Sequence, residues 1–383
     1  MSKPILKSNS AFLATGPSPA FKTVEESGFF MPLVQSSEFS ISIDRQTSKQ
    51  VGSQSYAVDD LTRSPNVNFN VDYLFSPLLI NEYLLGVYAE DSSTPLNMIN
   101  RDQNFYLIMN NQQGSDALKD FSQAPFRTNF SGMTCASIGN CFLSNYSLQF
   151  NVGSISTASC SFVGSNLKFE NLTGDIITIP AINLASGNAS GAGFMDFSNL
   201  AGSLSGEYLN AFGQYSNAYS QPALSPHNVE AELQNLQCGG TPLISGALIQ
   251  SVSIDIPFDR TDLYGLGSNY VYGRKLNLPV RASMNVTAVV QNFNSGDINA
   301  MSNSEESYNF RIQFTDPTKS AFSACVVENA KINSLSYSMD VNQTMQFSAS
   351  YSFDVASTFW DVDKTWLSIT GQWQNILEIW SEL

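Results

Sequence analysis

The residues that could carry chemistry are few in this chain of 383 amino acids. Its single histidine, His227, follows Pro226, and this context predicts a solvated loop. One histidine excludes most metal sites and most Ser-His or Cys-His nucleophiles. No GxGxxG, Walker A or HExxH motif occurs. Asp361 and Asp363 have the spacing of two calcium ligands, but no glycine or closing glutamate follows, which favours a solvated pair.

Cysteines and carboxylates add no reactive pattern. The five cysteines form no CxxC pair, so they do not predict a zinc site. Cys160 falls on the apolar side of an expected strand, where a thiol acts as a small hydrophobe, and this suits a reducing cytoplasm. Paired carboxylates for glycoside hydrolysis need no proximity in sequence, but nothing points to them. We therefore expect no enzyme activity, no catalytic or metal residues, no cofactor-binding residues and no cofactor.

The charge of the chain excludes a protein that grips nucleic acid. The net charge is −15 and the pI about 4.4, whereas such proteins neutralise phosphates with Lys and Arg. No Lys or Arg occurs from Phe169 to Asp259, a stretch that holds eight acidic residues. This stretch is either a solvated insertion or a segment kept free of positive charge because a polyanion passes nearby.

A repeated hairpin pattern dominates the rest of the sequence. Residues 140–164 align without a gap on residues 329–353, and apolar residues alternate with polar ones in the same register. A turn at Gly153-Ser154 or Asn342-Gln343 separates the two alternating runs of each copy. Period-two alternation around a short turn predicts a β-hairpin with one buried face. The sequence therefore predicts that one hairpin occurs twice.

The repetition extends upstream of the hairpin in both halves. The segment Ser40–Asp44 matches Ser251–Asp255, and Gly52-Ser53 matches Gly267-Ser268. Further matches in the same order are Leu61, Asn70 and Val71 with Leu276, Asn285 and Val286, and Tyr106 and Ile108 with Phe310 and Ile312. Four matched blocks in one order favour a tandem repeat of one β domain.

These elements predict an all-β protein with short helices: two homologous β-barrel or sandwich domains in tandem and a C-terminal helix. The expected divisions are an N-terminal arm (1–33), a first β domain (34–171), a Gly/Ser-rich insertion (172–245), a second β domain (246–356) and a Trp-rich tail (357–383). Short helices are expected within 76–88 and 228–237. The strand residues expected to face the core are Phe69, Val71, Phe150, Val152, Met284, Val286, Met339, Val341, Phe347 and Tyr351.

The tail differs in kind from the β domains. Trp366, Trp373 and Trp380 are spaced seven apart, which would align them along one side of a helix. Such a helix either caps a barrel of its own chain or docks on another subunit, because tryptophan is enriched at interface cores. These three tryptophans are the candidate intersubunit contacts.

The two copies SISID…VGS…NFNVDYL and SVSID…LGS…MNVTAVV, each followed by its hairpin, resemble a phage tail tube protein with a duplicated tube domain. The resemblance covers about 250 residues and is one of pattern. It implies small β domains that surround a channel for DNA, with three two-domain chains in a pseudo-hexameric ring and rings stacked into a tube. It also implies a channel lined by negative or neutral groups.

From this resemblance we expect a structural virion protein of a bacteriophage tail, made in the host cytoplasm. Its partners would be copies of itself, as homotrimeric rings stacked into a tube, and other tail proteins. DNA would pass through the lumen without specific binding, and no membrane insertion is expected. The alternative is a two-domain β-sandwich binding module, such as a receptor or glycan adhesin on a virion or cell surface. Another capsid or connector protein is a third possibility.

Overall fold

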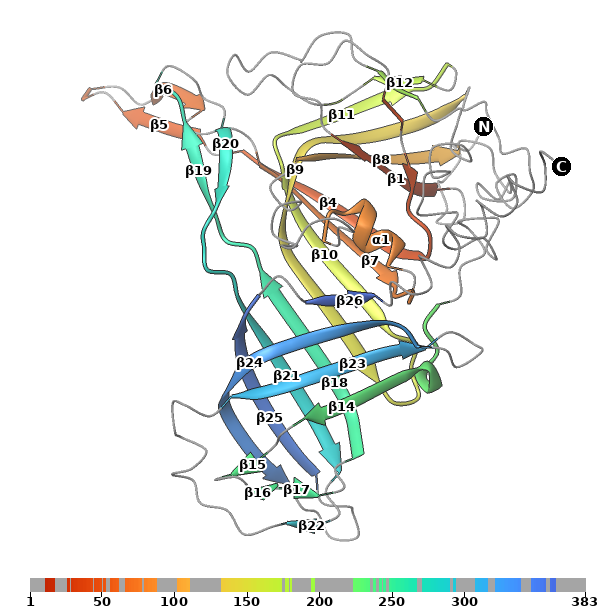
Figure 1. The fold of residues 1–383 in the computed structure, drawn as a ribbon. Helices are drawn as coiled ribbons and strands as arrows, with labels where there is room; N and C mark the ends of the chain where they lie inside the picture. The colour runs from red at the N-terminus through yellow and green to blue at the C-terminus, as the bar shows by residue number, and fades with distance from the viewer. Residues whose placement is uncertain are drawn as a thin grey trace, which may run out of the picture.

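The structure is a computed structural model, and its described residues form an almost entirely antiparallel β protein (Figure 1). The described residues are 11–17, 26–27, 29–43, 45–49, 51–52, 56–61, 66–77, 79–87, 102–110, 132–173, 176–178, 180, 194–196, 223–234, 237–238, 241–242, 244–245, 248–266, 271–289, 292–293, 307–315, 321–338, 346–355 and 359–362. The predicted all-β class is confirmed. The main sheet has 15 strands, and its path does not close on itself.

Six strands from the first half of the chain are hydrogen-bonded in the order β4-β7-β10-β9-β8-β1. Their bounds are β1 (Ala11–Pro17), β4 (Val34–Ser42), β7 (Asn66–Leu74), β8 (Gln103–Asn110), β9 (Met133–Asn151) and β10 (Thr157–Gly164). The strand β11 (Asn166–Asn171) joins the first part of β9. A separate hairpin, β5 (Arg45–Lys49) with β6 (Tyr56–Leu61), lies between β4 and β7 in sequence. We call these strands set A.

Six strands from the second half are paired in the corresponding order β18-β21-β25-β24-β23-β14. Their bounds are β14 (Val229–Gln234), β18 (Leu248–Pro257), β21 (Arg281–Val289), β23 (Tyr308–Thr315), β24 (Ala321–Ser338) and β25 (Gln346–Asp354). The strand β26 (Trp360–Val362) joins β24 as β11 joins β9. The hairpin of β19 (Arg260–Tyr264) and β20 (Val271–Leu276) lies between β18 and β21. We call these strands set B.

The two sets also share their irregularities. The pairing of β4 with β7 slips between Val34 and Ser36, and that of β18 with β21 slips between Ile249 and Ser251. The residue passed over is a glutamine in both sets, and its Nε2 donates to a carbonyl two residues back. Such β-bulges bend a strand at one defined position. Their recurrence shows that sets A and B match at the level of single residues.

A left-handed asparagine marks another matched position. Asn140 in β9 and Asn329 in β24 have φ angles of 54° and 56°. Asparagine adopts this conformation more readily than other non-glycine residues. The backbone N–H of Asn140 donates to Asn104 Oδ1 at 3.2 Å, and that of Asn329 donates to Asn309 Oδ1 at 3.0 Å. The predicted alignment of these two asparagines therefore coincides with one backbone feature in both sets.

Two of the upstream alignments are wrong in register. The bulges equate Ser36 with Ser251, so the match of Ser40–Asp44 with Ser251–Asp255 is displaced by four residues. A shift by four keeps the same face of a strand, so alternation alone could not detect the error. The pairings of β8 with β9 and of β23 with β24 equate Phe105 with Phe310, one residue from the predicted match with Tyr106.

Sets A and B are joined directly by β9 and β18. These strands pair antiparallel from Ser251 opposite Asn151 to Pro257 opposite Asn145, and we call this contact the seam. Figure 1 shows set A in the upper part of the molecule and most of set B in the lower part, with β9 and β10 reaching toward set B and the hairpin β19–β20 reaching up to the level of set A. The core is continuous across the junction, since the Phe314 ring lies 5.0 Å from that of Phe75 and 5.3 Å from that of Phe150.

Most of the residues expected to face the core are buried, and one is not. Phe69, Val71, Phe150, Met284, Val286, Phe347 and Tyr351 are at most 4% exposed. Val152 is 67% exposed, so its predicted burial is wrong. The reason is that β9 ends at Asn151 and the chain turns at Val152. Met339 and Val341 lie outside the described residues.

Other elements differ from the predicted boundaries. The helix expected within 76–88 is α1 (Ile80–Leu84), whereas the helix expected within 228–237 is wrong, because those residues form β14. The predicted N-terminal arm contributes β1 to set A, and the predicted insertion contributes β14 to set B. The predicted tail contributes β26. Trp366, Trp373 and Trp380 lie outside the described residues.

The remaining elements are short. The strands are β2 (Glu26–Ser27), β3 (Phe29–Phe30), β12 (Ile176–Thr178), β13 (Phe194–Asp196), β15 (Gln237–Cys238), β16 (Thr241–Pro242), β17 (Ile244–Ser245) and β22 (Asn292–Phe293). A 3-10 helix spans Pro226–Asn228 and contains His227, in a segment for which a loop was predicted.

Candidate assembly surface

The face of the joined sheet that points away from the core carries short, uncharged polar side chains. On each strand these residues alternate with buried ones, as the period of a strand requires. The same composition continues across the seam from set A to set B. The central residues of this polar face are Asn68, Asn70, Ser159, Ser161, Ser147, Gln149, Ser251, Ser253, Asn285, Thr287, Ser348 and Ser350.

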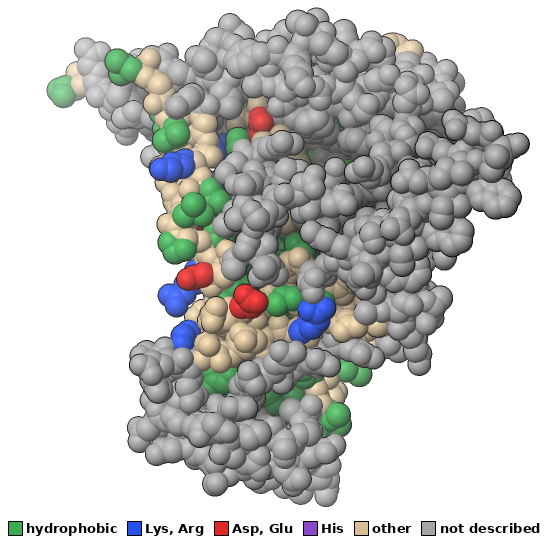
Figure 2. Space-filling model, in the orientation of Figure 1, with side chains coloured by type: hydrophobic (Ala, Val, Ile, Leu, Met, Phe, Trp, Pro, Cys, Tyr) green, Lys and Arg blue, Asp and Glu red, His purple; other side chains and the backbone are tan. Residues whose placement is uncertain are grey.

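Two carboxylates lie in the middle of the polar face, one in each set. Asp72 accepts hydrogen bonds from Ser36 Oγ at 2.5 Å and from Ser159 Oγ at 2.6 Å. Asp255 accepts one from Asn145 Nδ2 at 2.9 Å, across the seam. Both carboxylates are exposed on strands β7 and β18, where they add negative charge to a neutral surface. Among the described residues on the side that Figure 2 presents, charged side chains of both signs are visible, and several of them lie near the middle of the view.

Set A ends at a strand edge that has no neighbour within the described part of the chain. This edge is the outer side of β4, which pairs with β7 alone. Ile41 in β4 is 51% exposed, and Ile43, just beyond the end of this strand, is 47% exposed. An open edge with exposed apolar side chains is a template for pairing with another strand.

Set B presents a second open edge. The last part of β24, Ser334–Ser338, pairs only with β25 among the described strands. The corresponding part of β9 has β10 on one side and β18 on the other. Tyr337, on this segment, is 43% exposed. The strand of set B that matches β9 therefore lacks the neighbour that β9 has.

The hairpin β19–β20 docks on set A beside the seam. Arg260 Nε donates to the Leu143 carbonyl at 3.0 Å. Arg274 donates through Nη1 to Ser165 Oγ at 3.1 Å and through Nη2 to Asn66 Oδ1 at 3.2 Å. Its Nε also pairs with Asp262 at 3.1 Å.

An aromatic ring lies beneath these two cations. The guanidinium carbons of Arg260 and Arg274 lie 5.2 Å and 5.7 Å from the centre of the Phe142 ring. Cations within about 6 Å of an aromatic face are attracted by the ring quadrupole. Burial and the neighbouring Arg274 lower the pKa of Arg260 to about 10, so Arg260 remains charged at neutral pH. We call this contact the hairpin dock.

A buried carboxyl holds the helix α1 against set A. Glu82 is 1% exposed, and it accepts hydrogen bonds from the hydroxyls of Tyr73 at 2.8 Å and Tyr146 at 3.1 Å. Burial raises the pKa of Glu82 to about 7, which the two hydroxyls only partly offset. The Tyr73 oxygen also lies 3.8 Å from Cys160 Sγ. The cluster is enclosed, so it acts on stability and offers no site to a ligand.

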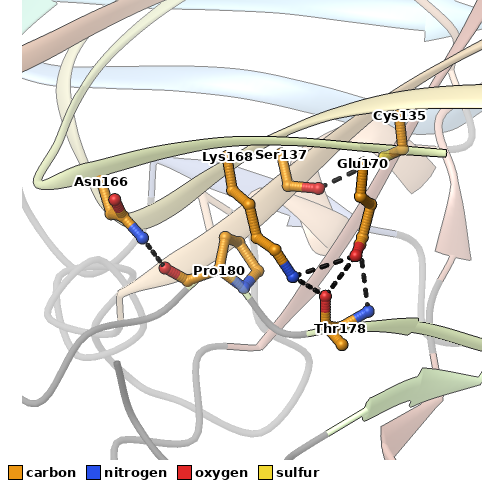
Figure 3. A network of polar contacts seen from close by, with 7 residues as sticks. All are labelled: Cys135, Ser137, Asn166, Lys168, Glu170, Thr178 and Pro180. Atoms are coloured by element: carbon orange, nitrogen blue, oxygen red, sulfur yellow. Dashed lines mark hydrogen bonds and ion pairs between the residues drawn. The ribbon is translucent and has the colours of Figure 1, made fainter. Parts of the chain in front are cut away.

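A second polar cluster ties β12 to β11. Glu170 accepts hydrogen bonds from the backbone N–H and the hydroxyl of Thr178, and Lys168 pairs with Glu170 at 2.9 Å (Figure 3). Lys168 Nζ also contacts the Thr178 hydroxyl. Asn166 Nδ2 donates to the Pro180 carbonyl at 2.5 Å, so three residues of β11 hold the chain that follows it.

The described residues hold no group of three or more His, Cys, Asp or Glu side chains suited to a metal ion. No helix within the described ranges is both long enough and apolar enough to span a membrane. Cys135, Cys141, Cys160 and Cys325 are buried free thiols whose pKa values burial raises. In Cys135 the pKa rises to about 12. These thiols are therefore protonated and packed in the core.

Sequence reasoning missed the residues of the hairpin dock and of the Glu82 cluster. Arg274 and Asn66 lie far apart in sequence, and no local spacing signals their contact. The recurrence of arginine at the first position of both hairpins, Arg45 and Arg260, was a signal that could have been read.

Comparisons with known proteins give no family. No family model matches the chain, and no curated protein matches it. Among solved structures, the anti-feeding prophage cap that terminates its tube is similar with 18% identity over 38% of this chain and 95% of that chain, at a TM-score of 0.29. The tail of an empty GTA particle is similar with 16% identity over 37% and 98%, at a TM-score of 0.25. The baseplate of the anti-feeding prophage is similar with 10% identity over 45% and 98%, at a TM-score of 0.27. A functional proposal must therefore come from the features of this chain.

Proposed function

We propose that this chain is a structural protein of a phage-type tail, in which two tandem copies of one tube domain build the wall of a conduit. The duplication is supported by the strand order that sets A and B share. It is supported further by the matched glutamine bulges and by the matched left-handed asparagines Asn140 and Asn329. Unrelated β domains would have no reason to place irregularities at the same register positions.

The observation that carries the assembly is the seam. In the seam β18 of set B pairs with β9 of set A and buries Ile254 opposite Leu148 and Ile256 opposite Tyr146. By the matched registers, β4 is the counterpart of β18, and the end of β24 is the counterpart of that part of β9. The open edge of β4 in one chain would thus pair with the open edge of β24 in the next chain, as β18 pairs with β9 within a chain. We call this contact between chains the second seam.

The counterpart residues are chemically suited to this second seam. Transferring the register places Phe39 of one chain opposite Tyr337 of the next, and Ile41 opposite Leu335. Ile41 and Tyr337 are exposed in the single chain, and pairing would remove their apolar surface from water. Repetition of the seam also covers both open edges, which otherwise promote uncontrolled aggregation.

The polar face forms the inner wall in this proposal. Ser, Asn and Thr side chains with scattered carboxylates such as Asp72 and Asp255 offer DNA phosphates few cations. Without cations, the counterions of DNA are not displaced and no strong binding follows. The strand β18 lies within the stretch free of Lys and Arg and crosses the middle of this face. This position favours the interpretation that the stretch is kept free of positive charge because a polyanion passes nearby, over the interpretation that it is a solvated insertion.

Three chains would contribute six domains to each ring, and rings would stack head to tail into a tube bound by other tail proteins. Stacking is a heterologous contact that does not close, so it propagates a filament. Deleting all of 1–33 or 357–383 is a poor test of stacking, because β1 and β26 would be lost with them. Deleting residues 366–383 removes the three tail tryptophans and spares β26.

Negative-stain electron microscopy of the purified chain tests the proposal. We expect rings or tubes, with three chains per ring by mass measurement. The test variant is Ile41→Lys, which places a charge at a half-exposed position on the outer strand β4. This variant should remain folded by circular dichroism and lose rings and tubes.

Monodisperse single chains at high concentration would contradict the proposal and favour the two-domain binding module instead. Rings of six chains would be consistent with assembly through strand edges. They would contradict the proposal that each chain contributes two domains to one ring.

A further inference from the structure

The two hairpins occupy matched places but carry different charges. Arg45 pairs with Leu61 in the first hairpin as Arg260 pairs with Leu276 in the second. Both hairpins slip register at the same step. The position of Arg274 in the second hairpin is taken by Asp59 in the first, because Thr47 pairs with Asp59 as Asp262 pairs with Arg274. One arginine is kept, and the other is replaced by an acid.

The surface that would receive the first hairpin has changed in the opposite sense. On set A the hairpin dock contains Asn66 and Phe142. Their counterparts on set B, by the matched registers of β7 with β21 and of β9 with β24, are Arg281 and Lys331. Both counterparts are cations where set A has neutral residues, and Arg281 is exposed. Loss of a cation from the hairpin is thus matched by a gain of cations on its counterpart surface.

A third exchange adds an acid to this surface. Ser165, which accepts from Arg274 in the hairpin dock, has Asp354 as its counterpart at the end of β25. Asp354 lies directly opposite Arg281 in the pairing of β25 with β21 and is exposed. By the same registers Asp59, in the place of Arg274, would meet two cations and one acid, a surface with a net positive charge.

We infer that the hairpin β5–β6 of one chain docks on set B of a second copy, where Asp59 pairs with Arg281 and Lys331 and Arg45 approaches the Ile332 carbonyl. This contact rests on the proposed assembly and lies beside the second seam, as the hairpin dock lies beside the first. Because Arg281 and Lys331 are cations, this surface would repel Arg274 of the other hairpin, so it disfavours docking of β19–β20 in place of β5–β6. Opposite charges across an interface fix register and suppress wrong pairings.

A charge swap tests this contact in the full-length chain. Asp59→Arg and Arg281→Asp are each expected to raise the concentration needed for half-maximal ring formation by about tenfold, since each places like charges together. The double variant D59R/R281D restores opposite charges and is expected to assemble as the unaltered chain does. Sedimentation velocity measures the assembly, and thermal unfolding of the dilute chain confirms that each variant is folded.

A matched control uses the next residue of the hairpin. Asp60→Arg makes the same change of net charge at the next register position, where Asp60 pairs with Gln46. It is expected to leave assembly within about twofold of the unaltered chain, because charges act weakly at a distance in salt. An effect of D60R equal to that of D59R would show that net charge alone is responsible and would overturn the inference.

Mixing the two single variants supplies a second readout. Every contact between a D59R chain and an R281D chain carries opposite charges, but a ring of three cannot alternate two kinds of chain. The mixture is therefore expected to leave one mismatched contact per ring and to assemble less well than the double variant.

The outcomes separate this inference from the proposed function. If the unaltered chain forms rings and the single variants do so equally well, the hairpin contact is wrong and the tube proposal stands. Single variants that fail without rescue in D59R/R281D would likewise overturn the pairing of Asp59 with Arg281. An unaltered chain that forms no rings would refute the proposed function itself.

Discussion

At the scale of single residues, Glu82 links the stability of the fold to pH. Its folded pKa of about 7 lies above the ordinary glutamate value of 4.5, so the folded state binds more protons between these values. The free energy of unfolding should therefore fall as pH rises from about 4.5 to about 7. Such a shift corresponds to roughly 3 kcal/mol at most.

Replacement of Glu82 by Gln tests this linkage. Glutamine keeps an oxygen that accepts from Tyr73 and Tyr146 but carries no charge at any pH. We expect E82Q to flatten the stability profile and to exceed the unaltered chain in stability at pH 8. Urea unfolding of the dilute chain at several pH values measures the effect. A profile for E82Q as steep as that of the unaltered chain would assign the pH dependence to another group.

A comparison of Phe347 with Val152 distinguishes the effect of burial from that of an alternating sequence pattern. Both belong to apolar alternating runs, yet Phe347 is 1% exposed and Val152 is 67% exposed. Phe347→Ala should cost about 3–5 kcal/mol because it leaves a cavity in a packed core. Val152→Ala should cost less than about 0.5 kcal/mol. Chemical denaturation measures both, and a cost below about 1 kcal/mol for Phe347→Ala would contradict the packing described.

At the scale of elements, the open edge of β24 should control assembly without controlling folding. Tyr337→Lys introduces a charge where the second seam would bury an aromatic ring. We expect the variant to fold with an unchanged melting temperature and to form no rings by sedimentation. Ser154→Lys adds the same charge at the exposed turn between β9 and β10 and should assemble normally. Normal rings from Tyr337→Lys would exclude this edge from the interface.

The elements also show how far the sequence leads. The hairpin alignment correctly predicted that β9–β10 and β24–β25 correspond residue by residue, because gapless alternation fixes both the spacing and the face of each strand. The match of Ser40 with Ser251 failed because a shift by an even number of residues leaves the pattern intact. The strand β14 was predicted as a helix, because its strand conformation depends on pairing with β23, which is distant in sequence and leaves no local pattern. Contacts such as Arg274 with Asn66 depend on tertiary placement that no local pattern encodes.

At the scale of the whole molecule, the polar face should govern how the tube treats DNA. Asn70→Lys combined with Asn285→Lys adds one cation per domain at matched, exposed positions of this face. We expect tubes to form and to bind DNA in a salt-dependent way, because phosphates now find cations. DNA passage should slow for the same reason. Filter binding at several salt concentrations measures the effect on purified tubes.

A control for this prediction places lysines away from the polar face. Ser154→Lys with Thr173→Lys adds the same charge at exposed loop positions. Tubes of this variant should bind DNA no better than tubes of the unaltered chain. Equal binding by both variants would show that the polar face does not line the channel.

The seam has a consequence for how quickly the assembly can start. Because β9 and β18 belong to one chain, every second domain contact of the proposed ring would form during folding, in a unimolecular step. Tethered partners meet at an effective concentration that can reach the millimolar range. A nucleus would then require the encounter of three molecules, where separate domains would require six. The lag before the first rings should accordingly depend on roughly the third power of concentration, and the duplication would act as a kinetic device that lets dilute chains nucleate.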